Sequence, residues 1–239
     1  MRGGSDPAME QYAEMMRGAG QMATAARVTR VVQIELPTAP ATTMQQVEPF
    51  TPKQFTSRRE MYQWLDEHFA EWRTTLTTQE KRWIQDYGGS YYRAINATLR
   101  GTKLDPDERF TLTKRQVKRA IQNLDSAVAK GKIPKNITLY RGIGENDLSK
   151  YVVGDVKSDA AFLSTSLDEV EAIDFANQSV DYGYKHKVLL EIHVRNEHSA
   201  AQVFGGLQEY EVLLPKATQL KIVAKKQEGE LLRVIAELL

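Results

Sequence analysis

The sequence lacks cysteine altogether and has only four histidines among its 239 residues. Without thiols there is no disulfide bond, no thiolate nucleophile and no cysteine-ligated zinc or iron–sulfur site. The histidines do not have the His-Glu-x-x-His spacing of a metalloprotease helix, so we expect no metal centre. No apolar run approaches the length of a transmembrane helix, and we expect no membrane span.

The charge is balanced, with 32 basic and 31 acidic side chains and a formal net charge of +1. No dense basic stripe alternates with aromatic residues, so nucleic acid is not an expected partner. The hydrophobic content of 41% is ordinary for a globular chain that can bury a sizeable core. We take a monomer as the default.

The first 49 residues differ in composition from the rest. Residues 1–7 resemble an expression leader, and such a leader is consistent with removal of a native signal peptide. Residues 8–49 are rich in Ala, Met, Gln, Thr and Pro, and residues 36–43 are typical of an extended linker. We therefore expect a leader with a flexible segment over residues 1–49 and one domain over residues 50–239.

Helical periodicity fills the first half of this domain, and strand patterns fill the second. Apolar residues recur every three or four positions in segments beginning near residues 59, 78, 90 and 114, and Thr77 and Thr113 each begin a capping box. We expect Gly88-Gly89 to break the second of these helices, Ser90 to cap the third, and Gly101 to end the third. Strand-like runs cover 137–140, 161–166, 188–194, 209–214, 220–224 and 231–239. Helices followed by strands indicate an α+β fold.

Two carboxylates stand out in the strand predicted over residues 209–214. Because side chains alternate faces along a strand, Glu209 and Glu211 are expected to point the same way. Two negative charges at such a short distance repel each other, so the pair does not stabilise the sheet. The pair is either a solvated strand edge or a functional site.

Polar residues also interrupt two other predicted strands. Arg141 ends an apolar strand and is followed by Gly142, which suits a phosphate contact or a strand-end ion pair. Ser164 and Ser166 flank Thr165 in an otherwise apolar run, where hydroxyls often bond to neighbouring backbone. Taken alone, each of these patterns has an ordinary structural explanation.

The three elements follow one another along the chain in the order Arg, Ser-Thr-Ser and Glu-x-Glu. This arrangement resembles the Arg-Ser-Glu class of bacterial mono-ADP-ribosyltransferase toxins. The similarity extends over residues 50–239 and includes the helical segment. It implies two packed antiparallel sheets around an NAD+ cleft, with helices against one side. NAD+ would be the substrate, and residues 50–239 the catalytic domain.

The resemblance implies a role for each residue of the motif. Glu211 would be the catalytic glutamate, since a carboxylate beside the nicotinamide ribose stabilises an oxocarbenium-like transition state. Ser164 would hold Glu211, and Arg141 would bind the NAD+ phosphates. Glu209 would orient and deprotonate an arginine acceptor, because a guanidinium is a poor nucleophile until it loses a proton.

The resemblance extends to further positions. Tyr87, Tyr92 and Asn96 are similar in spacing to NAD+-contacting residues, although core packing alone explains Tyr92 equally well. Gly142 would give a backbone contact to the nicotinamide amide, and Phe175 would pack on nicotinamide. Phe204, in the loop before the glutamates, would contribute with Glu209 to recognition of the target.

Three functions are consistent with these residues. The first is a toxin-type transferase that moves ADP-ribose from NAD+ to an arginine of a host protein, with actin among the candidates. The second is an NAD+ glycohydrolase, in which water replaces arginine, and the third is an inactive binding module of the same fold. For the first we expect a protein secreted or translocated into a host cell.

Overall fold

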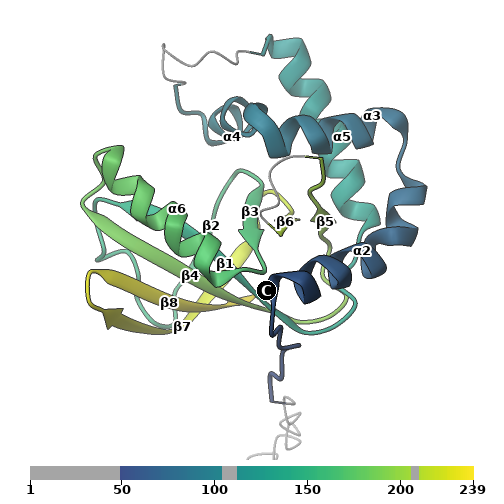
Figure 1. The fold of residues 1–239 in the computed structure, drawn as a ribbon. Helices are drawn as coiled ribbons and strands as arrows, with labels where there is room; N and C mark the ends of the chain where they lie inside the picture. The colour runs from purple at the N-terminus through teal and green to yellow at the C-terminus, as the bar shows by residue number, and fades with distance from the viewer. Residues whose placement is uncertain (1–48, 104–111, 206–209) are drawn as a thin grey trace, which may run out of the picture. The chain divides into compact units, whose positions relative to one another are not determined.

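The chain runs from helices to strands, in agreement with the α+β prediction (Figure 1). The computed structural model describes residues 49–103, 112–205 and 210–239. The helices are α2 (Arg58–Thr75), α3 (Thr78–Asp86), the π-helical turn η2 (Tyr87–Tyr91), α4 (Tyr92–Arg100), α5 (Lys114–Lys130) and α6 (Glu169–Asp181). The strands are β1 (Ile137–Glu145), β2 (Val156–Ser158), β3 (Leu163–Ser166), β4 (His186–Val194), β5 (Ala201–Gln202), β6 (Glu211–Leu214), β7 (Gln219–Glu228) and β8 (Leu231–Leu238).

Side-chain caps begin two of these helices as predicted. Thr77 accepts a hydrogen bond from the backbone N–H of Glu80, whose carboxylate accepts one from the N–H of Thr77. Thr113 and Gln116 form the same reciprocal pair at α5. Each pair satisfies two of the backbone donors that the first turn of a helix leaves free.

The break expected at Gly88-Gly89 takes a different form. The chain does not leave the helix and begin a new one at Ser90; it passes through η2, in which only Gly89 has non-helical angles (φ −90°, ψ −105°). The N-cap of α4 is Tyr91, which makes no side-chain cap, so the predicted Ser90 cap is wrong. The end of α4 at Gly101 is confirmed, with a left-handed φ of +68° that glycine adopts without strain.

The strands form one mixed sheet in the order β2-β7-β8-β4-β1-β3-β6-β5. This corrects the expected pair of antiparallel sheets in two respects: β4 and β8 are parallel, and the two halves share a continuous hydrogen-bonded order. The halves meet at β1 and β3, which are joined by the single pair Tyr140↔Ser166, whereas β1 and β4 pair over their whole length. The joint between β1 and β3 is therefore narrow.

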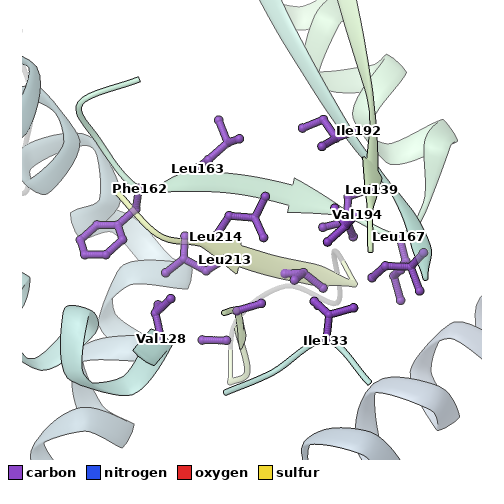
Figure 2. Packing of buried hydrophobic residues seen from close by; sticks show 14 of the residues in the cluster. Val128, Ile133, Leu139, Phe162, Leu163, Leu167, Ile192, Val194, Leu213 and Leu214 are labelled. Carbon is purple, nitrogen blue, oxygen red and sulfur yellow. The ribbon is translucent and has the colours of Figure 1, made fainter. Parts of the chain in front are cut away.

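A continuous apolar core lies between the helices and the short strands (Figure 2). Phe162 and Leu213 are fully buried, and Val128 of α5 is 2% exposed. Burial of such side chains stabilises a fold by about 1.5–3 kcal/mol each. The same core includes Ile192 and Val194 of β4, so one apolar cluster connects both halves of the sheet.

Helix α6 lies across β1 and β4 and packs closely on β1 at Gly142 (Figure 1). A Cβ atom at Gly142 would lie 1.7 Å from the carbonyl oxygen of Ala172 and 2.6 Å from the backbone nitrogen of Ala176. Backbone atoms of a helix cannot move aside as a flexible side chain can. The glycine that the sequence suggested for ligand approach is thus required for helix packing.

Glu80 is a charged group within this interior, with 3% of its surface exposed. Both of its carboxylate oxygens accept hydrogen bonds from the Lys130 ammonium at 2.7 Å. Burial alone would raise the pKa of Glu80, but the bonds from Lys130, Ser126 and Thr77 outweigh it and lower this pKa to about 2. The ion pair fastens α3 to the last turn of α5.

Gly142→Ala should lower the free energy of unfolding by about 2 kcal/mol or more, because α6 must shift to admit the methyl group. Urea unfolding followed by circular dichroism measures the change. An unfolding midpoint equal to that of the wild type would contradict the tight approach of α6 to β1.

Glu80→Gln should cost about 3 kcal/mol at neutral pH, since the folded-state pKa of about 2 lies below the ordinary value of 4.5. The depressed pKa stabilises the fold fully above pH 4.5, and this contribution is lost as the pH falls from 4.5 towards 2. The difference between the wild type and the variant should therefore shrink over that interval in chemical unfolding. Glu67→Gln, which removes an exposed carboxylate of α2, is the control; an equal loss there would refute a special role for Glu80.

Candidate active site

A cavity of about 760 Å³ collects most of the residues singled out in the sequence. Its walls come from η2 and α4 on one side and from β1, β3, α6 and the start of β6 on the other. The predicted site residues that line it are Tyr87, Tyr92, Asn96, Arg141, Gly142, Ser164, Phe175 and Glu211. The volume lies within the range of about 300–1,000 Å³ usual for small-molecule sites.

Arg141 brings a positive charge to the floor of this cavity. Its Nη1 donates a hydrogen bond of 2.6 Å to the carbonyl oxygen of Ser164, across the narrow joint between β1 and β3. Burial lowers the pKa of Arg141 below its ordinary value, and the positive charge of Arg100 acts in the same direction. Because that ordinary value is above 12, the guanidinium stays protonated and has further N–H donors for a ligand.

Glu211 supplies the negative charge. It is the first residue of β6, is paired with Ser166 across the sheet and lines the cavity. The π-helical turn comes close to its carboxylate: a Cβ atom at Gly88 would lie 3.9 Å from Oε2 of Glu211 and 2.3 Å from the side chain of Val203. Gly88, considered in the sequence only as a helix breaker, thus lets the turn pack against Val203 beside Glu211.

Ser164 and Ser166 lie on the same face of β3 as the cross-strand position of Glu211, since alternate residues of a strand share a face. The hydroxyl of Ser164 lies 3.0 Å from that of Tyr87, and the hydroxyl of Ser166 accepts a hydrogen bond from the N–H of Asp168. Thr165 points to the other face and donates to the carbonyl oxygen of Val212. The role expected for Ser164 towards Glu211 stays a prediction.

Tyr87 and Asn96 form a buried polar chain that leads to Ser164. Tyr87 is 1% exposed, and its hydroxyl accepts a hydrogen bond of 2.9 Å from Nδ2 of Asn96. Burial, together with the negative charge of Glu211, raises the pKa of Tyr87 to about 12, so the phenol is neutral at physiological pH. Oδ1 of Asn96 is buried and has no hydrogen-bond partner among the described residues.

Glu209 lies outside the described residues, but its neighbour Tyr210 changes the expectation for the pair. Tyr210 has a left-handed φ of +51°, and β6 begins only at Glu211. The strand predicted over residues 209–214 therefore does not include Tyr210, and its described part is Glu211–Leu214. Face alternation along a strand cannot relate Glu209 to Glu211, because a left-handed residue interrupts the extended conformation.

Phe175, expected to pack on nicotinamide, and Tyr92, expected to contact NAD+ from the helical side, both line the cavity. Phe175 projects from α6 with 40% of its surface exposed, and it lines the cavity. Tyr92 packs partly against the core, with its ring 6.3 Å from that of Tyr87, so it has both a packing role and a place at the cavity. Phe204 is partly buried and packs edge-to-face on Trp72 at 6.2 Å, and its contact with a target stays a prediction.

Further cationic residues, which the sequence analysis did not assign to the site, line the helical wall: Arg93, Arg100 and Lys103. Arg100 forms two hydrogen bonds with Asp159, of 2.9 and 2.6 Å, which fix its guanidinium. The clue in the sequence was Leu99-Arg100-Gly101, where a cation ends the helix on the side of the cavity. With Arg141, these groups place four basic side chains around the cavity that Glu211 lines, one of which, Arg100, is paired with Asp159.

The described residues contain no group of three or more His, Asp or Glu side chains that could hold a metal ion. Within these same ranges, no helix is both long and apolar enough to cross a membrane.

The chain is similar in sequence to several known proteins. The curated relatives include NAD(+)-arginine ADP-ribosyltransferase EFV of Enterococcus faecalis, 31% identical over 113 residues, which cover 47% of this chain and 22% of the relative. The NAD(+)-arginine ADP-ribosyltransferase of Enterobacteria phage T4 is 49% identical over 67 residues, which cover 27% of this chain and 10% of the relative. The chain thus spans about a fifth or less of the length of these relatives.

Solved structures share the fold. The ADP-ribosylating toxin BECa of a Clostridium perfringens binary enterotoxin, solved with NADH, is 26% identical and superposes with a TM-score of 0.61 over 75% of this chain and 48% of the toxin. The ADP-ribosyltransferase Vis from Vibrio splendidus, at 22% identity, gives 0.63 over 76% of this chain and 82% of its own. The model for the ADP-ribosyltransferase exoenzyme family matches residues 61–238. The resemblance expected from the sequence is confirmed, and the chain belongs to the ADP-ribosyltransferase exoenzyme family.

Proposed function

We propose that residues 50–239 form the catalytic domain of an NAD+-dependent protein-arginine ADP-ribosyltransferase. The observation that carries the proposal is the convergence of Arg141, Ser164 and Glu211 on one cavity of about 760 Å³. Family membership and the names of the curated relatives support the reaction and its arginine acceptor. NAD+ is the substrate of the reaction.

The charges around the cavity suit two parts of NAD+, the diphosphate and the nicotinamide ribose. Arg141 and Arg100 offer N–H donors to the negatively charged diphosphate, for which guanidinium groups are the usual partners. Glu211 faces the part of the substrate that becomes positive, and the exposed ring of Phe175 offers a surface for nicotinamide.

In the reaction, the bond between the anomeric carbon and the nicotinamide nitrogen breaks, and nicotinamide leaves with the electron pair as a neutral molecule. Positive charge then develops on the ribose ring, and the carboxylate of Glu211 stabilises it electrostatically. A guanidine nitrogen of the acceptor forms the new bond to the same carbon. Glu209 accepts the proton that this nitrogen releases.

The proposed function includes a target protein and a cellular location. The acceptor is an arginine of a host-cell protein, and actin is one candidate. The solved neighbours include a toxin component from a binary enterotoxin, in keeping with a protein that is secreted or translocated into a host cell.

Nicotinamide release from NAD+ tests the function directly. The purified protein is assayed with and without agmatine, a small guanidino acceptor, and the ADP-ribosylated product is identified by mass spectrometry. Release that agmatine stimulates, together with the agmatine adduct, would support arginine transfer. Release unaffected by agmatine would indicate a glycohydrolase, and absence of NAD+ binding would indicate a binding module of the same fold.

Glu211→Ala should reduce both transfer and hydrolysis by at least about a hundredfold, because both reactions pass through the same positively charged transition state. Nicotinamide release with and without agmatine measures the two activities. Retention of near wild-type hydrolysis in this variant would exclude Glu211 from the cleavage step.

Glu209→Ala should abolish transfer to agmatine while leaving part of the hydrolysis, since water needs less help than a protonated guanidinium to attack. The ratio of adduct to free ADP-ribose measures the partition. Parallel loss of both products would contradict the role given to Glu209.

A further inference from the structure

Arg58 is an exposed arginine that reaches three groups beside the Glu-x-Glu motif. It is the first residue of α2, and its Nε donates a hydrogen bond of 2.5 Å to the carboxylate of Asp168. A second contact of 3.6 Å joins Nη2 to Glu171, and the guanidinium carbon lies 6.0 Å from the ring centroid of Tyr210. Arg58 thus connects the start of α2 to the start of α6 and to the residue between Glu209 and Glu211.

Tyr210 is held in an unfavourable backbone conformation. A tyrosine with φ of +51° has its Cβ close to its own backbone oxygen, so such a residue persists only when its surroundings fix it. Its carbonyl oxygen accepts a hydrogen bond of 3.2 Å from the N–H of Leu167, and its ring packs partly against the core. The guanidinium of Arg58 lies near this ring and adds a third constraint.

The partners of Arg58 are themselves well fixed. Asp168 is 4% exposed and caps α6 by accepting a hydrogen bond from the N–H of Val170. The hydrogen bond to Asp168, followed by its charge, raises the pKa of Arg58, so the guanidinium is permanently charged. The side chain of Arg58 is nevertheless 55% exposed, and ion pairs of such exposed groups add little to stability. A role in holding the turn at Tyr210 explains this contact better than a contribution to global stability.

We propose that Arg58 is a positioning residue for the acceptor step: through Tyr210 it holds the turn that leads into Glu211, and it thereby favours transfer to arginine over hydrolysis. The inference rests on the proposed function. Glu211 is also anchored by the pairing of β6 with β3, so loss of Arg58 leaves the cleavage step largely intact. Glu209 is the next residue in the sequence before Tyr210, so a contact that fixes the backbone of Tyr210 acts directly beside the carboxylate proposed to serve the acceptor.

The test compares Arg58→Gln with Arg58→Lys, which keeps the charge, and with Arg82→Gln as a matched control. Arg82 is also an exposed helical arginine with a carboxylate partner, Asp86, and it does not line the cavity. Nicotinamide release and agmatine adduct are measured together. Arg58→Gln should lower the transfer-to-hydrolysis ratio on the order of tenfold, Arg58→Lys should restore much of it, and Arg82→Gln should change nothing.

A double-mutant experiment tests whether Arg58 acts through the ring of Tyr210 or only supports the structure in general. Glycine adopts a left-handed φ without strain, so Tyr210→Gly keeps the turn accessible while it removes the ring that Arg58 contacts. In the Tyr210→Gly background, adding Arg58→Gln should alter the transfer-to-hydrolysis ratio by less than about twofold. Melting temperatures of all variants are measured alongside.

Three results would overturn the inference: a parallel fall of both activities in Arg58→Gln, no change in either, or an equally large drop of the ratio in the Tyr210→Gly background. The proposed function is tested separately by the wild type in the same assay. Wild-type protein without agmatine-stimulated release would overturn both proposals. Active wild type with an unaffected Arg58→Gln variant would overturn only the role of Arg58.

Discussion

The hydrogen bond from the Arg141 guanidinium to the Ser164 carbonyl crosses the weakest joint of the sheet. Strands β1 and β3 share one residue pair, so the ladder alone contributes little there, and the arginine replaces part of the missing strand pairing with a charge-assisted bond. The same guanidinium faces the cavity. A residue that holds the two halves of the sheet together therefore also brings positive charge to the proposed phosphate site, and one geometry serves both purposes.

Near this joint, buried polar side chains form a chain of hydrogen bonds with one another. Asn96 donates to Tyr87, and Tyr87 pairs with Ser164 on the strand that Arg141 contacts. Buried polar groups are costly unless they are hydrogen-bonded, so such a chain restrains its members more than apolar packing would. The chain ends at Asn96, whose Oδ1 is buried without a hydrogen-bond partner among the described residues.

Glycines govern how closely the helical elements approach the site. Gly142 lets α6 rest on β1, and Gly88 lets the π-helical turn pack against Val203 beside Glu211. In both places a methyl group would collide with its surroundings, which explains why flexible-looking residues stand at rigid points of the structure. The sequence suggested a ligand contact for the first and a helix end for the second, because a glycine in a sequence does not reveal what lies beside it.

The sequence by itself determined the order of helices and strands and the capping boxes at Thr77 and Thr113, and its resemblance to a known family implied the convergence of Arg141, Ser164 and Glu211. These depend on local periodicity, on local hydrogen bonds and on a motif whose order along the chain is fixed. Only the tertiary structure decided the parallel pairing of β4 with β8, the left-handed turn at Tyr210, and the approach of Arg100 and Arg58 to their acidic partners. Each of these depends on contacts between residues far apart in the chain, whose free energy exceeds local preference and leaves no periodic pattern in the sequence.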